Sequence, residues 1–409
     1  MTDLASRTDR RVYDLLDPDF YRSEPQDAWA WMRANEPVYR DQRNGLWGIT
    51  KHADIQEVER RSQVFVSSLG YRANWSAEEI NMIAQDDPRH RSQRMLVQPH
   101  LTQRAIGERR PEIERLVDEL VEAMVASGPD VEFVTAFAAQ LPARTTCRLL
   151  GFPEEMWPQL KSWSERLMRV DMIHRDGDQF SQFIDANMEF AAMVGMLAPS
   201  KIDAASKGCP MHDFMTLWLT QPVDGAPLSP EAVVHETGLF IAGGAETTRT
   251  ALGHGLRAFA DHPDQWDAMA ADPSLVPGAV EEVLRFVTPL NNMFRRAAVD
   301  TEVRGQRIRR GDRLVLLYPA ANRDEDVFSS PHSFDIRRSP NPHVSFGFGT
   351  HLCVGANFAR ASLVTSFEAL SRRFRAPEVR SEPDIESNIF ARAVRRFDVR
   401  MSPRRVSGV

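Results

Sequence analysis

Apolar residues recur at helical spacing along most of this chain, and this pattern restricts it to a helix-rich fold. Within residues 112–125 they return every three to four positions, which places them on one face of an amphipathic helix. Similar patterns predict helices over residues 25–35, 154–170, 178–196, 263–271 and 357–373. Segments that favour strands are short and cover residues 46–50, 293–303, 306–308 and 313–318. Many helices with a minor sheet predict a mostly α fold of the α+β class.

The chain contains no internal repeat, low-complexity tract or glycine/serine linker that would divide it. We therefore expect a single domain over residues 1–409. Two long stretches, residues 64–89 and 319–346, are irregular. Loops of this length in compact domains usually carry function or cover a site.

Charge and cysteine usage exclude several classes of protein. The net charge of −7 argues against general binding to nucleic acid or anionic membranes. Cys147, Cys209 and Cys353 are too far apart for a disulfide framework or a cysteine-rich zinc module. The longest apolar runs have eight residues, a membrane span needs about 18, and the N-terminus lacks the apolar core of a secretion signal. We expect a cytoplasmic protein without a membrane anchor or a nucleic-acid partner.

The most informative segment surrounds Cys353. Glycines at positions 347, 349 and 355 bracket this cysteine, and an apolar helical pattern follows. Tight turns would bring backbone amides close to the sulfur, and the following helix would stabilise a thiolate by its positive end. The glycines match neither common phosphate-binding pattern, and His351 with Cys353 supplies at most two zinc ligands. On these residues alone, a buried structural cysteine remains the alternative.

Phe346, Gly349, His351, Cys353 and Gly355, at these spacings, resemble the haem-ligand signature of the cytochromes P450. The resemblance extends over nearly the whole chain. It implies the P450 fold, a helix-rich triangular prism with small antiparallel sheets. It also implies haem b as the cofactor, with the Cys353 thiolate as the ligand of its iron, and O2 as the co-substrate.

Glu282 and Arg285 lie three residues apart on a predicted helix. An isolated pair of this kind is usually a solvated surface contact worth about 0.3 kcal/mol. The resemblance implies instead that Glu282, Arg285 and Arg338 form a structural network behind the haem. Such a network would serve folding and haem retention and would take no part in the chemistry.

A further helix, which Ser229 caps and Pro230 begins, is predicted to include residues 238–250. Gly243 and Gly244 in its middle each cost about 1 kcal/mol relative to alanine. A close helix crossing would explain both glycines. The resemblance implies a groove over one face of the haem.

In that groove, the resemblance places Ala242 and Gly243 against the cofactor and makes Glu246 and Thr247 the proton-delivery pair. Thr247 would form a hydrogen bond at the oxygen site, and Glu246 would help to relay protons from solvent. Thr248 is expected to pack in the helix instead.

The propionates of a buried haem need cationic or hydrogen-bonding partners. The resemblance assigns this role to His90, Arg94, Arg295 and His351. The spacing to Asp300 in similar sequences selects Arg295 over its neighbour Arg296.

Substrate contacts are expected from apolar residues of four segments. They are Leu69, Trp75, Ile80, Ile83, Leu239, Leu290, Met293, Ile389 and Phe390. Their character favours a bulky lipophilic substrate. Residues 264–278 and 292–295 resemble actinobacterial enzymes that oxidise sterol side chains, which favours a steroid or terpenoid.

The resemblance implies a monooxygenase that inserts one oxygen atom from O2 into a C–H bond. The chain has no flavin or NAD segment, so electrons are expected from NAD(P)H through a ferredoxin reductase and a ferredoxin that docks on a basic patch near the thiolate. We expect a monomer. The alternatives are a peroxide-driven haem-thiolate enzyme, which Glu246 and Thr247 disfavour, and a haem- or lipid-binding protein without turnover.

Overall fold

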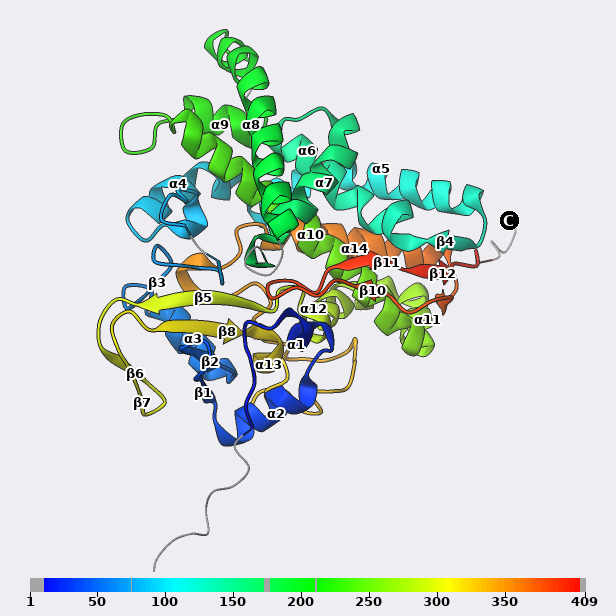
Figure 1. Cartoon of the computed structure of the whole chain (residues 1–409). Coiled ribbons are helices and arrows are strands. Elements are labelled where there is room, and N and C mark those ends of the chain that lie inside the picture. Colours follow the sequence, from blue (N-terminus) through cyan, green and yellow to red (C-terminus); the bar gives the residue numbers. More distant parts are fainter. Residues whose placement is uncertain (1–10, 75, 173–176, 210–211, 405–409) are drawn as a thin grey trace, which may run out of the picture.

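The computed structural model describes residues 11–74, 76–172, 177–209 and 212–404. A long helix, α10 (Pro230–Asp261), runs through the middle of the molecule (Figure 1). Ser229 caps its N-terminus, because the Ser229 hydroxyl accepts a hydrogen bond from the Ala232 amide (3.2 Å). The other long helices are α5 (Gln103–Ser127), α6 (Gln140–Leu150), α7 (Trp157–Met168), α8 (Gly177–Ser206), α12 (Val276–Val287) and α14 (Ala356–Arg373).

Shorter helices complete the helical part. They are α1 (Pro18–Arg22), α2 (Gln26–Asn35), α3 (His52–Arg60), α4 (Arg89–Val97), α9 (Phe214–Thr220), α11 (Pro263–Ala271) and α13 (Tyr318–Ala321). Single turns are η1 (Met82–Ala84), η2 (Gln98–Leu101), η4 (Glu154–Met156), η5 (Val170–Met172), η6 (Pro273–Leu275) and η7 (Gly349–His351), with a π-helical turn at η3 (Val134–Ala138).

The largest sheet has the strand order β1-β2-β8-β5-β3. Its strands are β1 (Val38–Asp41), β2 (Leu46–Ile49), β3 (Phe65–Val66), β5 (Asn292–Ala297) and β8 (Arg313–Leu317). β2 and β8 pair in parallel, and the remaining pairs are antiparallel. Small antiparallel sheets join β4 (Asp130–Glu132), β12 (Asp398–Arg400) and β9 (Glu378–Val379), β10 (Asp384–Ile385) and β11 (Val394–Arg396), and β6 (Thr301–Val303) and β7 (Gln306–Ile308).

The mostly α fold with small sheets confirms the sequence-based expectation. The main differences concern boundaries. α5 begins at Gln103, nine residues before the predicted start, because the Thr102 side chain caps it by accepting from the Ala105 amide. The strand predicted over residues 293–303 is two strands, β5 and β6, that pair with different partners.

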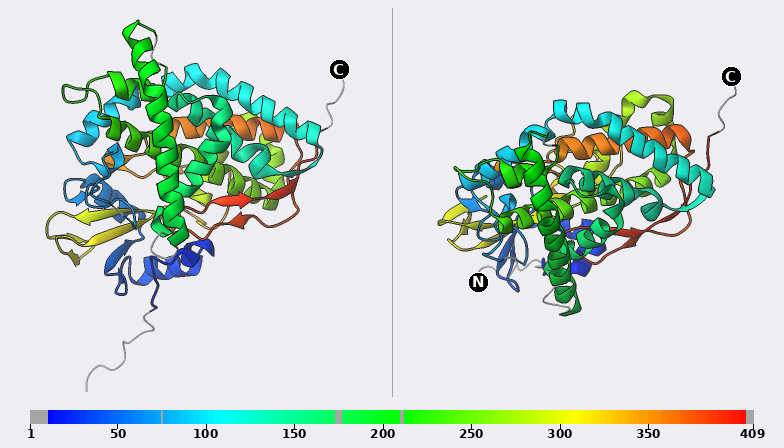
Figure 2. Two further views of the ribbon diagram at one scale, coloured as in Figure 1. Left: turned by 45° about the horizontal axis from the view of Figure 1, so that its top comes forward. Right: turned by 90° about the horizontal axis from the view of Figure 1, so that it is seen from above.

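The core lies where α10 crosses its neighbours. One apolar cluster packs α10 against α5, α11, α12 and α14, and a second packs it against α6, α7, α8 and α9. Figures 1 and 2 show the large sheet at one end of the molecule and α5 and α11 at the other. Within the described ranges, no helix combines the length and the apolar composition needed to cross a bilayer.

Candidate active site

The loop before α14 places Cys353 just ahead of that helix. Cys353 donates its backbone N–H to the Phe346 carbonyl (2.9 Å), and the Ala356 amide donates to the Cys353 carbonyl (3.3 Å). Gly349 has a φ of +68°, and a Cβ there would lie 2.6 Å from the carbonyl oxygen of Glu59. Only glycine fits this turn, because backbone atoms of α3 occupy the space of a side chain.

Cys353 is an exposed residue, but its thiol has little contact with solvent. The residue is exposed and unpaired, yet burial raises the pKa of its thiol, while the Gly355 amide, Arg94 and Arg360 act in the opposite direction. An amide donor and two guanidinium groups would stabilise an anionic sulfur there, so the donor set suits a thiolate ligand of a metal.

The two glycines in the middle of α10 have different environments. A Cβ at Gly244 would lie 2.7 Å from Oγ1 of Thr146 on α6, so a close helix crossing explains this glycine. Gly243 is exposed, and no atom lies within 4 Å of where its Cβ would be. The Thr247 hydroxyl donates to the Gly243 carbonyl (2.8 Å). Gly243 and Thr247 therefore border open space in the middle of a helix that is otherwise largely buried.

The Glu246 carboxylate lies in a cluster of charges. Its side chain is 1% exposed, and it pairs with Arg249 on the same helix and with Arg395 of β11 at 3.5 Å. Glu165 of α7 contacts both arginines, at 2.5 and 3.3 Å. Burial alone would raise the pKa of Glu165, but Arg249 and Arg395 lower it to about 2. The acid next to Thr247 is therefore held by two arginines that also join α10 to α7 and β11.

The expected propionate partners come from three elements. His90 on α4 is buried, and its ring centroid lies 4.2 Å from that of His351. Nη2 of Arg94, one turn along α4, donates to the Leu352 carbonyl (2.8 Å). On β5, Arg295 is buried and its neighbour Arg296 is half-buried, because successive strand residues face opposite sides.

Electrostatics in this group fit a dianionic ligand. Burial, followed by the positive charges of Arg295, His90 and Arg94, lowers the pKa of His351 to about 2. Burial also lowers the pKa of His90. Two neutral imidazoles and two guanidinium groups supply the donors and the two positive charges that a pair of propionates requires. The residues present therefore fit haem.

Glu282, Arg285 and Arg338 form one buried network. Arg285 and Glu282 are fully buried and form two hydrogen bonds of 2.7 and 2.8 Å. Arg338 Nε donates to Glu282 at 3.1 Å, and Arg285 also donates to the carbonyls of Asn322 and Pro331. The structure thus brings together three residues that are up to 56 positions apart.

The expected substrate-contact residues do not all meet. Phe390 packs with Ala242, Leu290 and Met293, and Ile80 and Leu239 border the cluster around α7, α8 and α10. Ile389 belongs to a different cluster with Tyr21 and Trp29. Leu69 is 41% exposed, Ile83 is half-buried within η1, and Trp75 lies outside the described residues.

Residues that the sequence did not single out contribute to the site. Met168 packs against Phe390, Arg249 and Arg395 hold Glu246, and Glu59 contacts Arg295. The spacing of three between Glu246 and Arg249 was a detectable signal. The other contacts join segments far apart in the chain, so no local pattern predicts them.

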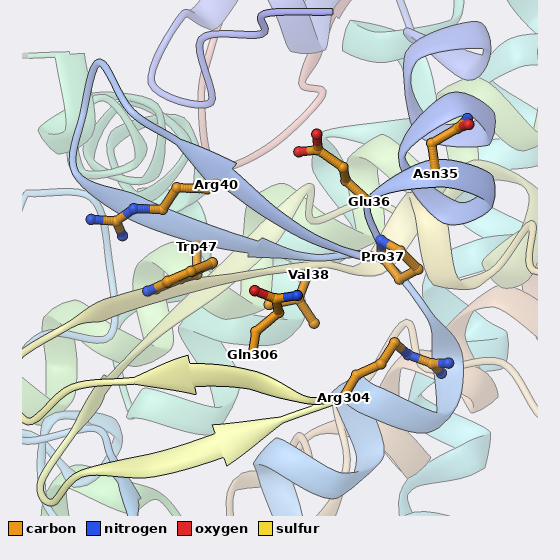
Figure 3. Close-up of a pocket in the computed structure, with 8 residues that line it drawn as sticks. All are labelled: Asn35, Glu36, Pro37, Val38, Arg40, Trp47, Arg304 and Gln306. Atoms are coloured by element: carbon orange, nitrogen blue, oxygen red, sulfur yellow. The ribbon is translucent and has the colours of Figure 1, made fainter. Parts of the chain in front are cut away.

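A separate open pocket of about 430 Å³ lies at the edge of the large sheet (Figure 3). It is lined by Asn35, Glu36, Pro37, Val38, Arg40, Trp47, Arg304 and Gln306. None of the expected site residues lines this pocket.

Comparison with known proteins shows the family of this chain. The model of the family described as "Cytochrome P450" matches residues 177–401. The chain is 37% identical over 372 residues to the steroid C26-monooxygenase of Mycobacterium tuberculosis H37Rv, with 91% of each chain covered. It is 31% identical over 411 residues to the linalool 8-monooxygenase of Pseudomonas putida, covering 96% of this chain and 99% of that protein.

Among solved structures, a Mycobacterium marinum cytochrome P450 in complex with pseudoionone superimposes with a TM-score of 0.87 at 30% identity, covering 96% of this chain and 100% of the other. The chain belongs to the cytochrome P450 family. It is a monooxygenase of that family, whose members use haem iron and O2.

Proposed function

We propose that Cys353 binds the iron of haem b as a thiolate in a loop shaped by Phe346, Gly349 and Gly355. The observation that carries this proposal is an exposed free cysteine whose thiolate form the Gly355 amide, Arg94 and Arg360 favour, against the opposing effect of burial. His90, Arg94, Arg295 and His351 hold the propionates, and Glu282, Arg285 and Arg338 support the loop. Thiolate-bound haem supplies the activation of O2 for insertion into a C–H bond. We propose that this chain binds neither a flavin nor NAD itself.

Thr247 and Glu246 deliver protons in this proposal. The Thr247 hydroxyl lies at the open space beside Gly243, where it can accept a hydrogen bond from a ligand, or donate one once it releases the Gly243 carbonyl. Glu246 is next to it and belongs to the charge cluster with Arg249, Arg395 and Glu165. For Glu246 to carry protons, its carboxylate has to exchange an arginine partner for water, so the arginines control access to the relay.

The proposed substrate is a lipophilic molecule with an alkyl or isoprenoid chain, such as a steroid or terpenoid. Ala242, Leu290, Met293 and Phe390 form an apolar group beside α10 that suits such a chain. Two relatives are named as a steroid C26-monooxygenase and a linalool 8-monooxygenase, and these names support a lipophilic substrate.

A ferredoxin is the proposed electron donor, reduced in turn by a ferredoxin reductase with NAD(P)H. Met95 and Leu352 are apolar residues with 53% and 43% of their surface exposed. The hydrogen bond from Arg94 to the Leu352 carbonyl places α4 beside the cysteine loop. Arg91 is exposed on α4, and Arg60 lies over the ring of Phe348. An apolar patch with arginines at its rim suits an acidic partner of a monomeric enzyme.

The decisive experiment has two parts. The ferrous carbonyl complex of the purified protein should show the red-shifted Soret band of thiolate ligation. With NADH, ferredoxin and ferredoxin reductase, oxygenated product should form in step with substrate consumption. Steady peroxide release without product would favour a binding protein, and product formation from added peroxide alone would favour the peroxide-driven alternative.

A further inference from the structure

The last turn of α3 carries a buried acid that the proposed function does not use. The Glu59 side chain is 1% exposed. Its Oε1 accepts hydrogen bonds from the Tyr318 hydroxyl (2.8 Å) and from Nη2 of Arg295 (3.4 Å), whereas its Oε2 has no hydrogen-bond partner. A buried carboxylate oxygen without a partner costs roughly 1–3 kcal/mol, so packing alone does not explain an acid here.

The same turn lies under the cysteine loop. A Cβ at Gly347 would lie 3.3 Å from Oε1 of Glu59, and Gly349 rests on the Glu59 carbonyl. The guanidinium of Arg60 lies 4.7 Å from the centroid of the Phe348 ring. The end of α3 therefore contacts the loop by backbone, carboxylate and guanidinium groups together.

Glu59 links this loop to a proposed propionate partner. Arg295 is buried, with a side chain 4% exposed, and a buried guanidinium is costly without a counter-charge. Besides the Glu59 contact, Arg295 donates through Nη1 to the carbonyl of its own neighbour Phe294 (2.7 Å). The carboxylate thus fixes one end of the guanidinium, and it also offsets the charge of that group.

We propose that Glu59 is a positioning residue for the haem, which orients Arg295 toward a propionate and, by its negative charge, lowers the reduction potential of the iron. This inference rests on the proposed haem binding at Cys353. Removing a negative charge near the haem favours the added electron, so its loss raises the potential.

The surroundings of Glu59 predict when this charge is present. Arg295 faces it from β5, Tyr318 from the start of α13 and Arg60 from its own helix, while the nearest loop residues, 346–350, contain no titratable group. Burial raises the pKa of Glu59 to about 7 against the opposing effects of Arg295, Tyr318 and the Phe348 amide. The charge should therefore act more strongly at about pH 8.5 than at about pH 6.

The test compares the reduction potentials of the wild type and Glu59→Gln. Glutamine keeps the shape and an acceptor oxygen but removes the charge. At about pH 8.5 the equilibrium constant for reduction should rise by roughly three- to tenfold, which is about 30–60 mV for one electron. The difference should shrink at about pH 6. Equal potentials for the two proteins at about pH 8.5 would overturn the inference.

Glu57→Gln is the matched control. Glu57 lies on the same helix, is 45% exposed and pairs with Arg61 at the surface, so this change should leave the potential unaltered. A shift equal to that of Glu59→Gln would mean that the effect is not specific to the buried acid.

Glu59→Leu tests the positioning role. It leaves Arg295 without its carboxylate, and haem should transfer to apomyoglobin about tenfold faster than from the wild type. An unchanged transfer rate contradicts that role, and if the leucine variant does not fold, the glutamine variant decides. A wild type without the thiolate Soret band refutes the proposed function instead, so the two failures are distinguishable.

Discussion

At the scale of single residues, two cysteines show how neighbours decide the chemistry of a thiol. Burial, with a smaller effect of Glu154 and Glu155, raises the pKa of Cys147 to about 12, and this thiol is part of the apolar core. Burial acts on Cys353 as well, but an amide and two guanidinium groups oppose it. Of these two thiols, Cys353 is the one with neighbouring groups that favour a negative charge.

Replacement of each cysteine by alanine should therefore have different results. Cys353→Ala should abolish the thiolate Soret band of the ferrous carbonyl complex and the oxygenation of substrate. Cys147→Ala should keep both, at a modest cost in stability from the lost core volume. Spectra of the two variants prepared in parallel check this expectation, and an intact band in Cys353→Ala contradicts it.

Loss of the buried Arg285 guanidinium should be costly for folding. Arg285→Lys removes the two-point contact with Glu282 and leaves that buried carboxylate partly unpaired. We expect the free energy of unfolding to fall by about 3 kcal/mol or more, measured by urea titration. The surface variant Arg257→Lys, at the exposed pair with Glu382, should cost less than about 1 kcal/mol.

At the scale of elements, two adjacent glycines of α10 have different structural roles, one in helix packing and one in leaving open space. At Gly244 it packs tightly on α6, and at Gly243 it leaves space. Helix propensity treats the two positions alike, at about 1 kcal/mol each. The difference between them arises from the neighbouring helix, and the sequence therefore left the two explanations open.

Alanine substitutions at Gly243 and Gly244 should distinguish these two roles. Gly244→Ala should lower the unfolding temperature, because its Cβ meets Thr146, whereas Gly243→Ala should leave it unchanged or raise it. Adding Thr146→Ala to Gly244→Ala removes the close oxygen and should restore part of the lost stability. Thermal unfolding of the three variants checks this, and equal effects of the two single changes would contradict it.

At the scale of the whole molecule, a buried histidine predicts sensitivity to acid. His254 lies inside α10 and bonds to the Arg392 carbonyl (2.9 Å). Burial, then the charge of Arg392, lowers its pKa to about 3. Below the ordinary pKa near 6.5 the unfolded chain binds a proton that the folded protein does not, so stability falls as the pH drops from about 6.5 toward 3.

His254→Gln should remove this contribution. Between about pH 6.5 and 5.5 the wild type should lose about 1 kcal/mol more than the variant, as measured by urea titration at both pH values. His212→Gln, a change at an exposed histidine, should keep the dependence of the wild type. A variant with the same slope as the wild type would show that other groups control the acid transition.

Local patterns predicted most of the helices and the cysteine loop, because both depend on residues close together in the chain. Predicted helix boundaries were wrong where a capping side chain decided the start, as at Thr102, whose hydroxyl begins α5 nine residues before the predicted position. Contacts between elements could be predicted only where the family resemblance implied them, as for Glu282 with Arg338. Glu59 comes from α3, Arg395 from β11, and Ile389 packs away from its neighbour Phe390, and none of these has a local signal.

The close approach of Gly349 to the main chain of α3 has a consequence for protein engineering. Since a carbonyl oxygen and not a side chain blocks the space beside this glycine, no substitution in α3 can make room for a bulkier residue. A designer who wishes to graft the ligand loop onto another scaffold would have to transplant the end of α3, with Glu59 and Arg60, along with it.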